Sequence, residues 1–181
     1  YGAALYAREA GKSVTVAELT AAIEKSLAER TVANRLPPLF ANQTEYEAFC
    51  KRHAGADVAR RDIREYSGNA WLGIDCGSTT TKLCLLSAEK ELLYTYYSSN
   101  KGNPVQLVKE QLEKIYDLCG SRVRIVGSAV TGYGEELIQH AFGVDKGVVE
   151  TIAHYTAAKY FCPEVDFILD IGGQDIKCFK I

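Results

Sequence analysis

The chain has 181 residues, of which 47% are hydrophobic and 24% charged, and its formal net charge is −2. A chain of this length usually forms one domain, and this apolar fraction is ample for a hydrophobic core. The small net charge gives no electrostatic reason to expect a nucleic acid or an anionic membrane as partner. No apolar run of roughly eighteen residues and no signal-peptide pattern occurs, so the sequence predicts a cytoplasmic protein.

Two features of the composition bear on completeness and redox chemistry. The chain contains no methionine, even at position 1, so we expect it to be a fragment of a longer protein. Its six cysteines form no C-x-x-C pair, and three of them stand in apolar strand-like runs, where cysteine behaves as a small hydrophobic residue. The spacing therefore favours reduced packing cysteines over a zinc or iron–sulfur site.

The first 66 residues read as a helical segment followed by a linker. The opening heptad is helical in composition, and Thr15 to Glu18 form a capping box for a helix that reaches about Arg30. Two prolines at 37 and 38 must end helical structure. Thr44 to Glu47 form a second capping box for a short helix that ends near His53. The charged run over 60–65 is typical of a solvated linker face.

From residue 70 the pattern changes to alternating strands and helices. Pro104 follows the capping residue Asn103, and Gly120 ends the helix that they begin. The expected strands are 71–76, 80–87, 91–97, 123–129, 165–170 and 175–181, and the expected helices are 104–119, 134–141 and 149–160. This order predicts an α/β fold with a mixed five-stranded sheet and flanking helices over residues 67–181.

Two glycine-rich turns carry the candidate site. Each follows a strand that ends in a carboxylate, first Asp75 and then Asp170. Glycine allows backbone N–H groups to approach phosphate oxygens, and concave runs of N–H groups attract anions. Asp75 and Asp170 are candidates for catalysis and for holding Mg²⁺ through water. The candidate phosphate contacts are Gly77, Ser78, Thr79, Thr80, Lys82, Gly172 and Gly173. Gln174 is suited to orienting an attacking water, Asp175 could be only a strand-entry carboxylate, and Lys82 could point at phosphate or toward solvent.

Two further segments lie between these turns. Thr131 to Gly134 predict a strand-to-helix turn in which glycines permit tight packing near the site. Glu150 and His154 stand four residues apart and so share one helix face. They could form a hydrogen-bonded pair, half of a metal site or a contact at the cleft, and the sequence leaves these alternatives open.

These segments together resemble the actin-like ATPase superfamily, and within it the activators of 2-hydroxyacyl-CoA dehydratases and the ATPase subunits of benzoyl-CoA reductase. The similar segments are 72–82, 130–134, Glu150 with His154, and 170–175. The resemblance covers roughly residues 70–181 and implies one ribonuclease-H-like lobe. The opening heptad looks like the last helix of such an ATPase, which would make residues 1–66 the tail of a preceding unit plus a linker.

The resemblance also implies a function. Members of this family use ATP and Mg²⁺ to drive a low-potential electron into a dehydratase or related reductase, and a homodimer holds one [4Fe-4S] cluster. The cluster segment would follow Ile181, so no cysteine of this chain is assigned to it. We therefore expect the intact parent to be an ATPase and the isolated fragment to be inactive.

Two alternatives use the same fold. A small-molecule kinase of the amino-sugar type transfers the phosphoryl group to a bound hydroxyl and needs a carboxylate base beside it. A chaperone or filament protein uses ATP only as a conformational switch. Gln174 after the paired glycines favours the activator, and the sequence names neither the acyl-CoA substrate nor the partner enzyme.

Overall fold

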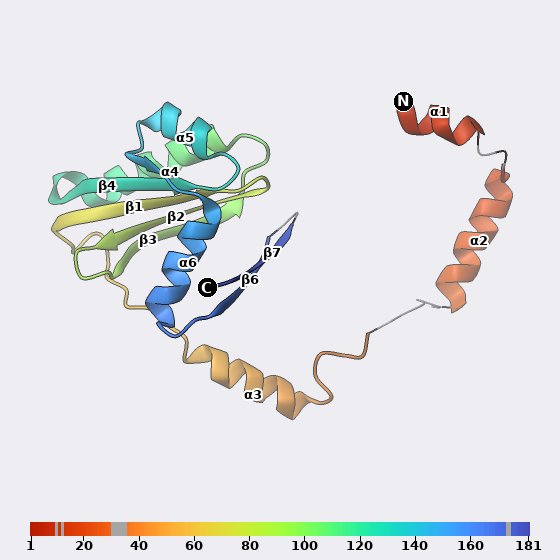
Figure 1. The fold of residues 1–181 in the computed structure, drawn as a ribbon, viewed down its shortest axis with the longest axis horizontal. Helices are drawn as coiled ribbons and strands as arrows, with labels where there is room; N and C mark the ends of the chain where they lie inside the picture. The colour runs from red at the N-terminus through yellow and green to blue at the C-terminus, as the bar shows by residue number, and fades with distance from the viewer. Residues whose placement is uncertain (10, 12, 30–35, 173–174) are drawn as a thin grey trace. The chain divides into compact units, whose positions relative to one another are not determined.

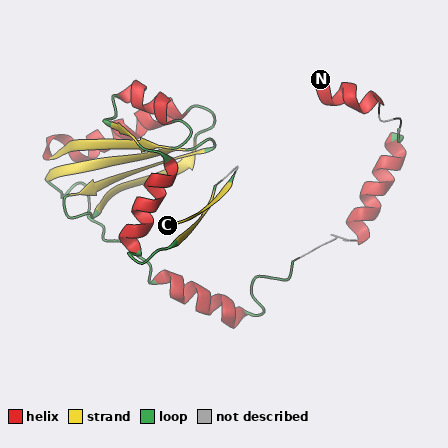
Figure 2. Cartoon of the chain, in the orientation of Figure 1, coloured by secondary structure: helices red, strands yellow, loops and turns green. Residues whose placement is uncertain are grey.

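The structure is a computed structural model that describes residues 1–9, 11, 13–29, 36–172 and 175–181. It divides into two compact units, Tyr1–Gly55 and Ala56–Ile181. Figure 1 shows the order of their elements along the chain, and Figure 2 distinguishes helices from strands. Within the described part of the chain, no helix combines the length and apolar character that crossing a membrane requires.

The first unit contains three helices, α1 (Gly2–Glu9), α2 (Val16–Glu29) and α3 (Gln43–Ala54). The capping box of α2 is confirmed, because the Glu18 amide donates to Thr15 Oγ1 and the Thr15 amide donates to Glu18 Oε2. The second predicted box is wrong in register. Asn42 caps α3 by accepting from the Glu45 amide, since asparagine is among the strongest N-cap residues.

The second unit is built on a five-stranded sheet. Its strands are β1 (Gly68–Cys76), β2 (Thr80–Ser87), β3 (Leu92–Ser99), β4 (Val123–Thr131) and β5 (Lys146–Gly147). The spatial order is β3-β2-β1-β4-β5, in which β1 pairs antiparallel with β2 and parallel with β4. The predicted mixed five-stranded sheet is therefore confirmed.

The membership of that sheet differs from the expectation, since two predicted strands lie outside it and one strand that was not predicted belongs to it. The predicted strands 165–170 and 175–181 are β6 (Phe167–Ile171) and β7 (Ile176–Lys180), which form a separate antiparallel hairpin. The fifth strand is instead the two-residue β5, which pairs with Ala129 and Val130 of β4. A strand of two residues is too short to show an alternation of apolar and polar residues, so the sequence pattern could not reveal it.

The core lies between the sheet and two helices, α4 (Pro104–Cys119) and α5 (Glu135–Phe142). Alternate residues of β1 and β2 are buried, as expected of a sheet with one face covered. The buried side chains come from both layers and include Leu72, Ile74, Leu83, Leu85, Val108, Ile115 and Ile138. A short 3₁₀ turn (Gly120–Arg122) links α4 to β4, and α6 (Glu150–Phe161) connects the sheet to the hairpin.

The segment before the sheet is fastened to its edge strand. The Leu92 amide donates to Ala59 O, and the Arg61 amide donates to Leu92 O. Ile63 is buried in the core, while Arg61 and Arg64 on either side of it are exposed. The charged run therefore faces solvent as predicted, but one apolar residue within it anchors the segment.

Candidate functional site

The first glycine turn leaves β1 and enters β2 through a tight bend. The Gly77 amide donates to Thr80 O over 2.9 Å, which closes the turn. Ser78 and Thr79 are exposed at its tip, and Thr80 is half-buried where β2 begins. The hydroxyl groups at the tip therefore lie where a solvent-borne phosphate could reach them.

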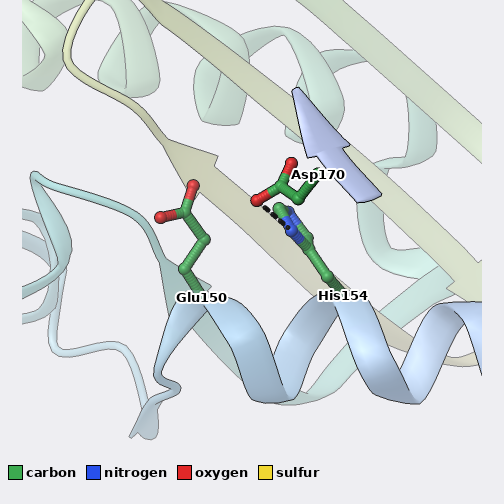
Figure 3. Close-up of side chains that lie close together, drawn as sticks. All are labelled: Glu150, His154 and Asp170. Atoms are coloured by element: carbon green, nitrogen blue, oxygen red, sulfur yellow. Dashed lines mark ion pairs between the residues drawn. The ribbon is translucent and has the colours of Figure 1, made fainter. Parts of the chain in front are cut away.

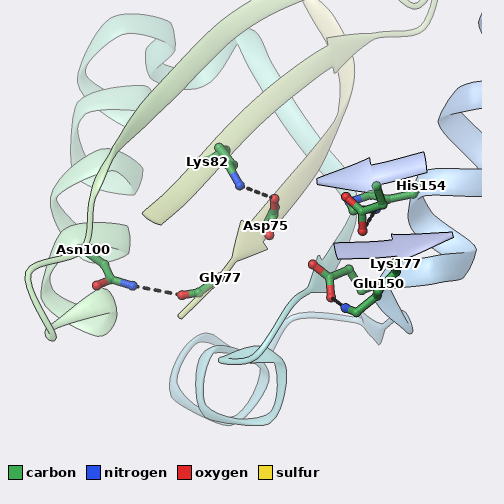
Figure 4. A network of polar contacts seen from close by, with 8 residues as sticks. Asp75, Gly77, Lys82, Asn100, Glu150, His154 and Lys177 are labelled. Atoms are coloured by element: carbon green, nitrogen blue, oxygen red, sulfur yellow. Dashed lines mark hydrogen bonds and ion pairs between the residues drawn. The ribbon is translucent and has the colours of Figure 1, made fainter. Parts of the chain in front are cut away.

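A side chain that sequence reasoning did not single out holds this turn in place. Asn100, which is 6% exposed, donates from Nδ2 to Gly77 O over 2.9 Å (Figure 4). Its own amide donates to Thr79 O, and its Oδ1 accepts from the Gly102 amide. The sequence signal was only an asparagine at the end of a strand, whose partner lies 23 residues away.

Asp75 forms an ion pair on the sheet. It stands directly opposite Lys82 on β2, and Lys82 Nζ lies 2.8 Å from Asp75 Oδ2. The ammonium group therefore contacts the Asp75 carboxylate (Figure 4), whereas the sequence left open whether it points at phosphate or toward solvent. Asp75 Oδ1 is buried and has no hydrogen-bond partner among the described residues. A buried carboxylate oxygen without a partner is costly, and a cation or its water shell would satisfy it.

The turn over 131–134 packs against the end of β1. The Gly134 amide donates to Cys76 O over 2.8 Å. Gly132 has φ +94°, and a Cβ there would lie 2.6 Å from Cys76 O and 3.0 Å from Asp75 Oδ1. These contacts fit the predicted structural role, because only glycine lets this turn approach the Cys76 backbone and the Asp75 carboxylate so closely. Tyr133 between the two glycines is exposed.

The second glycine turn joins β6 to β7. The Gly172 amide donates to Asp175 O over 2.9 Å. Gly173 and Gln174, the other predicted contacts of this turn, lie outside the described residues. Asp170 and Lys177 are direct cross-strand partners on the half-buried face of the hairpin.

Helix α6 meets that face of the hairpin with the two residues whose role the sequence left open. His154 Nδ1 lies 3.0 Å from Asp170 Oδ2, and Lys177 Nζ lies 2.6 Å from Glu150 Oε2 (Figures 3 and 4). One ligand atom from each of Glu150, His154 and Asp170 lies within 4.8 Å of the others. Glu150 and His154 therefore pair with the hairpin instead of with each other.

The charge balance of this group depends on Lys177. Hydrogen bonds to Glu150 and then to Asp175 raise the pKa of Lys177 to about 12. The ammonium group therefore stays charged throughout the physiological range and offsets the nearby carboxylates. Asp75 and Asp170 take different partners, Lys82 and His154, and their predicted approach to a shared cation stays a prediction.

Comparison with known proteins places this arrangement in a family. Residues 72–181 match the BadF/BadG/BcrA/BcrD ATPase family. An uncharacterized protein of Methanocaldococcus jannaschii is 39% identical over 112 residues, which cover 61% of this chain and 42% of that protein. A 2-hydroxyisocaproyl-CoA dehydratase activator of Clostridioides difficile is 33% identical over 111 residues, which cover 61% and 40%.

A solved structure agrees with the sequence comparisons. The activator of the 2-hydroxyisocaproyl-CoA dehydratase from Clostridium difficile with bound ADPNP has a TM-score of 0.51 and 29% identity, and the match covers 62% of this chain and 41% of that one. The fold is thus of the actin-like ATPase type. The chain spans about two fifths of the length of the curated relatives that it matches.

Proposed function

This chain belongs to the BadF/BadG/BcrA/BcrD ATPase family, and we propose that it supplies the phosphate-binding part of an ATP-hydrolysing activator. The activator would drive low-potential electron transfer to a 2-hydroxyacyl-CoA dehydratase or a related reductase. One observation carries the proposal. Both glycine turns follow a strand whose last residue but one is an aspartate, and both fall within the matched region.

The residues of the two turns take complementary roles in this proposal. The hydroxyl groups and the amides at the tip of the first turn bind phosphate oxygens, since such donors favour anions, and Gly77, whose own amide closes the turn, leaves room for their approach. In the second turn the Gly172 amide is bonded to Asp175 O, so Gly172 leaves room for phosphate while Gly173 donates, and Gln174 orients the attacking water. Lys82 neutralises Asp75 while the site is empty and can turn toward phosphate when a cation replaces it. The phosphate-binding residues of the first turn are Gly77, Ser78, Thr79 and Thr80.

The donor set also suits Mg²⁺. Asp75 has a buried oxygen without a partner, and carboxylate oxygens are the ligands that Mg²⁺ prefers, often through water. We propose that Asp75 and Asp170 hold the ion in this way. When bound, Mg²⁺ neutralises phosphate charge during phosphoryl transfer to water.

An iron–sulfur cluster does not fit the residues of this chain. Such a cluster needs several cysteine thiolates close together. Cys76 and Cys119 are buried singly, and Cys50, Cys162 and Cys178 are exposed. Among the described residues, the group of three potential metal ligands that lie close together is Glu150, His154 and Asp170, which contains no cysteine. The electron-transfer centre of the activator proposal is therefore not assigned to residues 1–181.

The proposal is tested by anaerobic ATP hydrolysis in the full-length protein that carries this chain, with and without a candidate dehydratase. Asp75→Asn and Asp170→Asn should each abolish turnover while circular dichroism stays unchanged. Tyr133→Ser, at an exposed position outside both turns, is the matched control and should retain activity. Turnover retained in both aspartate variants would refute the assigned roles.

A second measurement separates the activator from a kinase. An activator hydrolyses ATP with water as acceptor and activates its dehydratase, whereas a kinase turns over only with a hydroxyl substrate. The 181-residue chain alone should bind ATP–Mg²⁺ poorly, because the exposed tip of the first turn leaves charge interactions screened by water and salt. Micromolar binding in a calorimetric titration of this chain would contradict that expectation.

A further inference from the structure

The contact between α6 and the β6–β7 hairpin consists of two crossed polar pairs. Glu150 and His154 stand one turn apart on α6, and Asp170 and Lys177 stand opposite each other on the hairpin. The pairs join His154 to Asp170 (Figure 3) and Glu150 to Lys177 (Figure 4). In each pair, one side chain comes from α6 and the other from the hairpin, so neither element needs the contact in order to form.

The His154 contact fixes one of the two oxygens of Asp170. The side chain of Asp170 is 17% exposed and that of His154 is 32% exposed, so water competes only weakly for this contact. His154 Nδ1 lies 3.0 Å from Asp170 Oδ2, and this polar contact orients the carboxylate through Oδ2. The other oxygen of Asp170 is then held in a defined direction and stays available to a cation or its water.

The Lys177 contact compensates the negative charge of the neighbouring carboxylate, Glu150. Glu150 lies close enough to Asp170 to repel it, because their oxygens belong to one group within 4.8 Å. Lys177 binds Glu150 Oε2 at 2.6 Å and Asp175 Oδ2 at 3.2 Å, which neutralises part of this charge. The two pairs thus differ in purpose, since one orients Asp170 and the other compensates the charge beside it.

We infer that His154 is a positioning residue that holds Asp170 in the orientation needed to bind the divalent cation. The inference rests on the proposed function, which gives Asp170 its cation. Hydrogen-bond partners of groups that bind metals typically change metal affinity by about 10- to 100-fold when they are removed. His154 itself does not touch the cation and keeps the proton on Nδ1 when the cation binds.

The test measures Mn²⁺ binding to the full-length protein that carries this chain, by paramagnetic broadening of its NMR signals. His154→Leu removes the donor and should weaken binding about tenfold or more. His154→Asn keeps an N–H donor near the position of Nδ1 and should recover most of the affinity. Lys159→Met alters another polar residue of α6, which pairs with Tyr155, and should leave the affinity unchanged. An affinity for His154→Leu equal to that of the unmodified chain would overturn the inference.

Two further measurements separate positioning from other roles. Nitrogen-15 spectra of His154 should show a protonated Nδ1 before and after Mg²⁺ is added, and loss of that proton on binding would indicate direct ligation and refute positioning. Lys177→Met loosens the same helix–hairpin contact but leaves Glu150 uncompensated, so it should not weaken cation binding. If it weakens binding as much as His154→Leu does, the effect comes from the contact as a whole and the inference fails.

The failure of the inference is distinguishable from that of the proposed function. Asp170→Asn should abolish the same Mn²⁺ broadening in its neighbourhood. If Asp170→Asn has no effect, the proposed cation site is wrong, and His154 then has nothing to position. If Asp170→Asn abolishes binding while His154→Leu does not change it, the site stands and only the positioning role is refuted.

Discussion

Replacement of Asn100 by alanine should loosen the first phosphate turn. The substitution removes two side-chain hydrogen bonds, one from Nδ2 to Gly77 O at 2.9 Å and one from the Gly102 amide to Oδ1 at 3.1 Å. A hydrogen bond of this kind contributes roughly 1 kcal/mol net, and a polar group left buried without a partner costs at least as much. We therefore expect Asn100→Ala to lower the free energy of unfolding by about 2 kcal/mol.

The matched control is Asn103→Ala, three residues along the same turn. Asn103 caps α4 by accepting from the Gln106 amide, and loss of such a cap costs about 1 kcal/mol. It makes none of the contacts given for Asn100 to Gly77 or Thr79. Both variants should therefore unfold at lower urea concentration, but only Asn100→Ala should release the turn.

Amide hydrogen exchange of the folded chain distinguishes the two variants. In Asn100→Ala the Gly77 amide, which donates to Thr80 O, should exchange about tenfold faster or more, since each 1.4 kcal/mol of local stability is a factor of ten. In Asn103→Ala its exchange should change only as much as global stability does. Equal exchange of Gly77 in both variants would refute the role given to Asn100.

Three other predictions concern packing, thiol reactivity and pH. Gly132→Ala places Cβ 2.6 Å from Cys76 O and should lower the free energy of unfolding in urea by more than about 2 kcal/mol. Gly143→Ala, also at positive φ but in open space, should lower it by about 1 kcal/mol. Equal losses in the two variants would contradict the close approach at Gly132. Burial raises the pKa of the Cys76, Cys84 and Cys119 thiols, so mass spectrometry should find slower alkylation there than at the exposed cysteines, and uniform rates would disprove this. Hydrogen bonds from Ser128 hold the pKa of Asp145 below its usual 3.8. The stabilisation that Asp145 gives to β5 is therefore present above about pH 4 and is lost as the pH falls through the lowered pKa of the folded protein. Hydrogen exchange of β5 in Asp145→Asn should lack this acid dependence.

Local order was predictable from the sequence where neighbouring residues decide it. Thr15 and Glu18 satisfy each other's backbone across three residues, and Asn103, Pro104 and Gly120 bound α4 as expected. The alternation of buried residues along β1 and β2 also follows directly from their order. The capping error at α3 is one of register, because the prediction took Thr44 as the N-cap residue whereas Asn42, two residues earlier, caps the helix.

The two carboxylates and the first glycine turn were also identified from sequence, because the pattern of strand, carboxylate and glycine is contiguous. What the carboxylates contact was not. Lys82 meets Asp75 because the β1–β2 register places them opposite each other, and the tight turn fixes that register. His154 meets Asp170 only because α6 returns along the hairpin, which no local pattern encodes.

The sequence by itself thus determined most of the helices and strands, the cap of α2, the ends of α4 and the position of the first glycine turn. Only the tertiary structure determined that β5 is the fifth strand of the sheet, that Asn100 donates to Gly77 O and that α6 contacts the hairpin through two polar pairs. The physical reason is the range of the forces that select each feature. Backbone hydrogen bonds and side-chain periodicity act over a few residues, whereas these contacts join groups 16 to 27 residues apart that meet only after the core has packed.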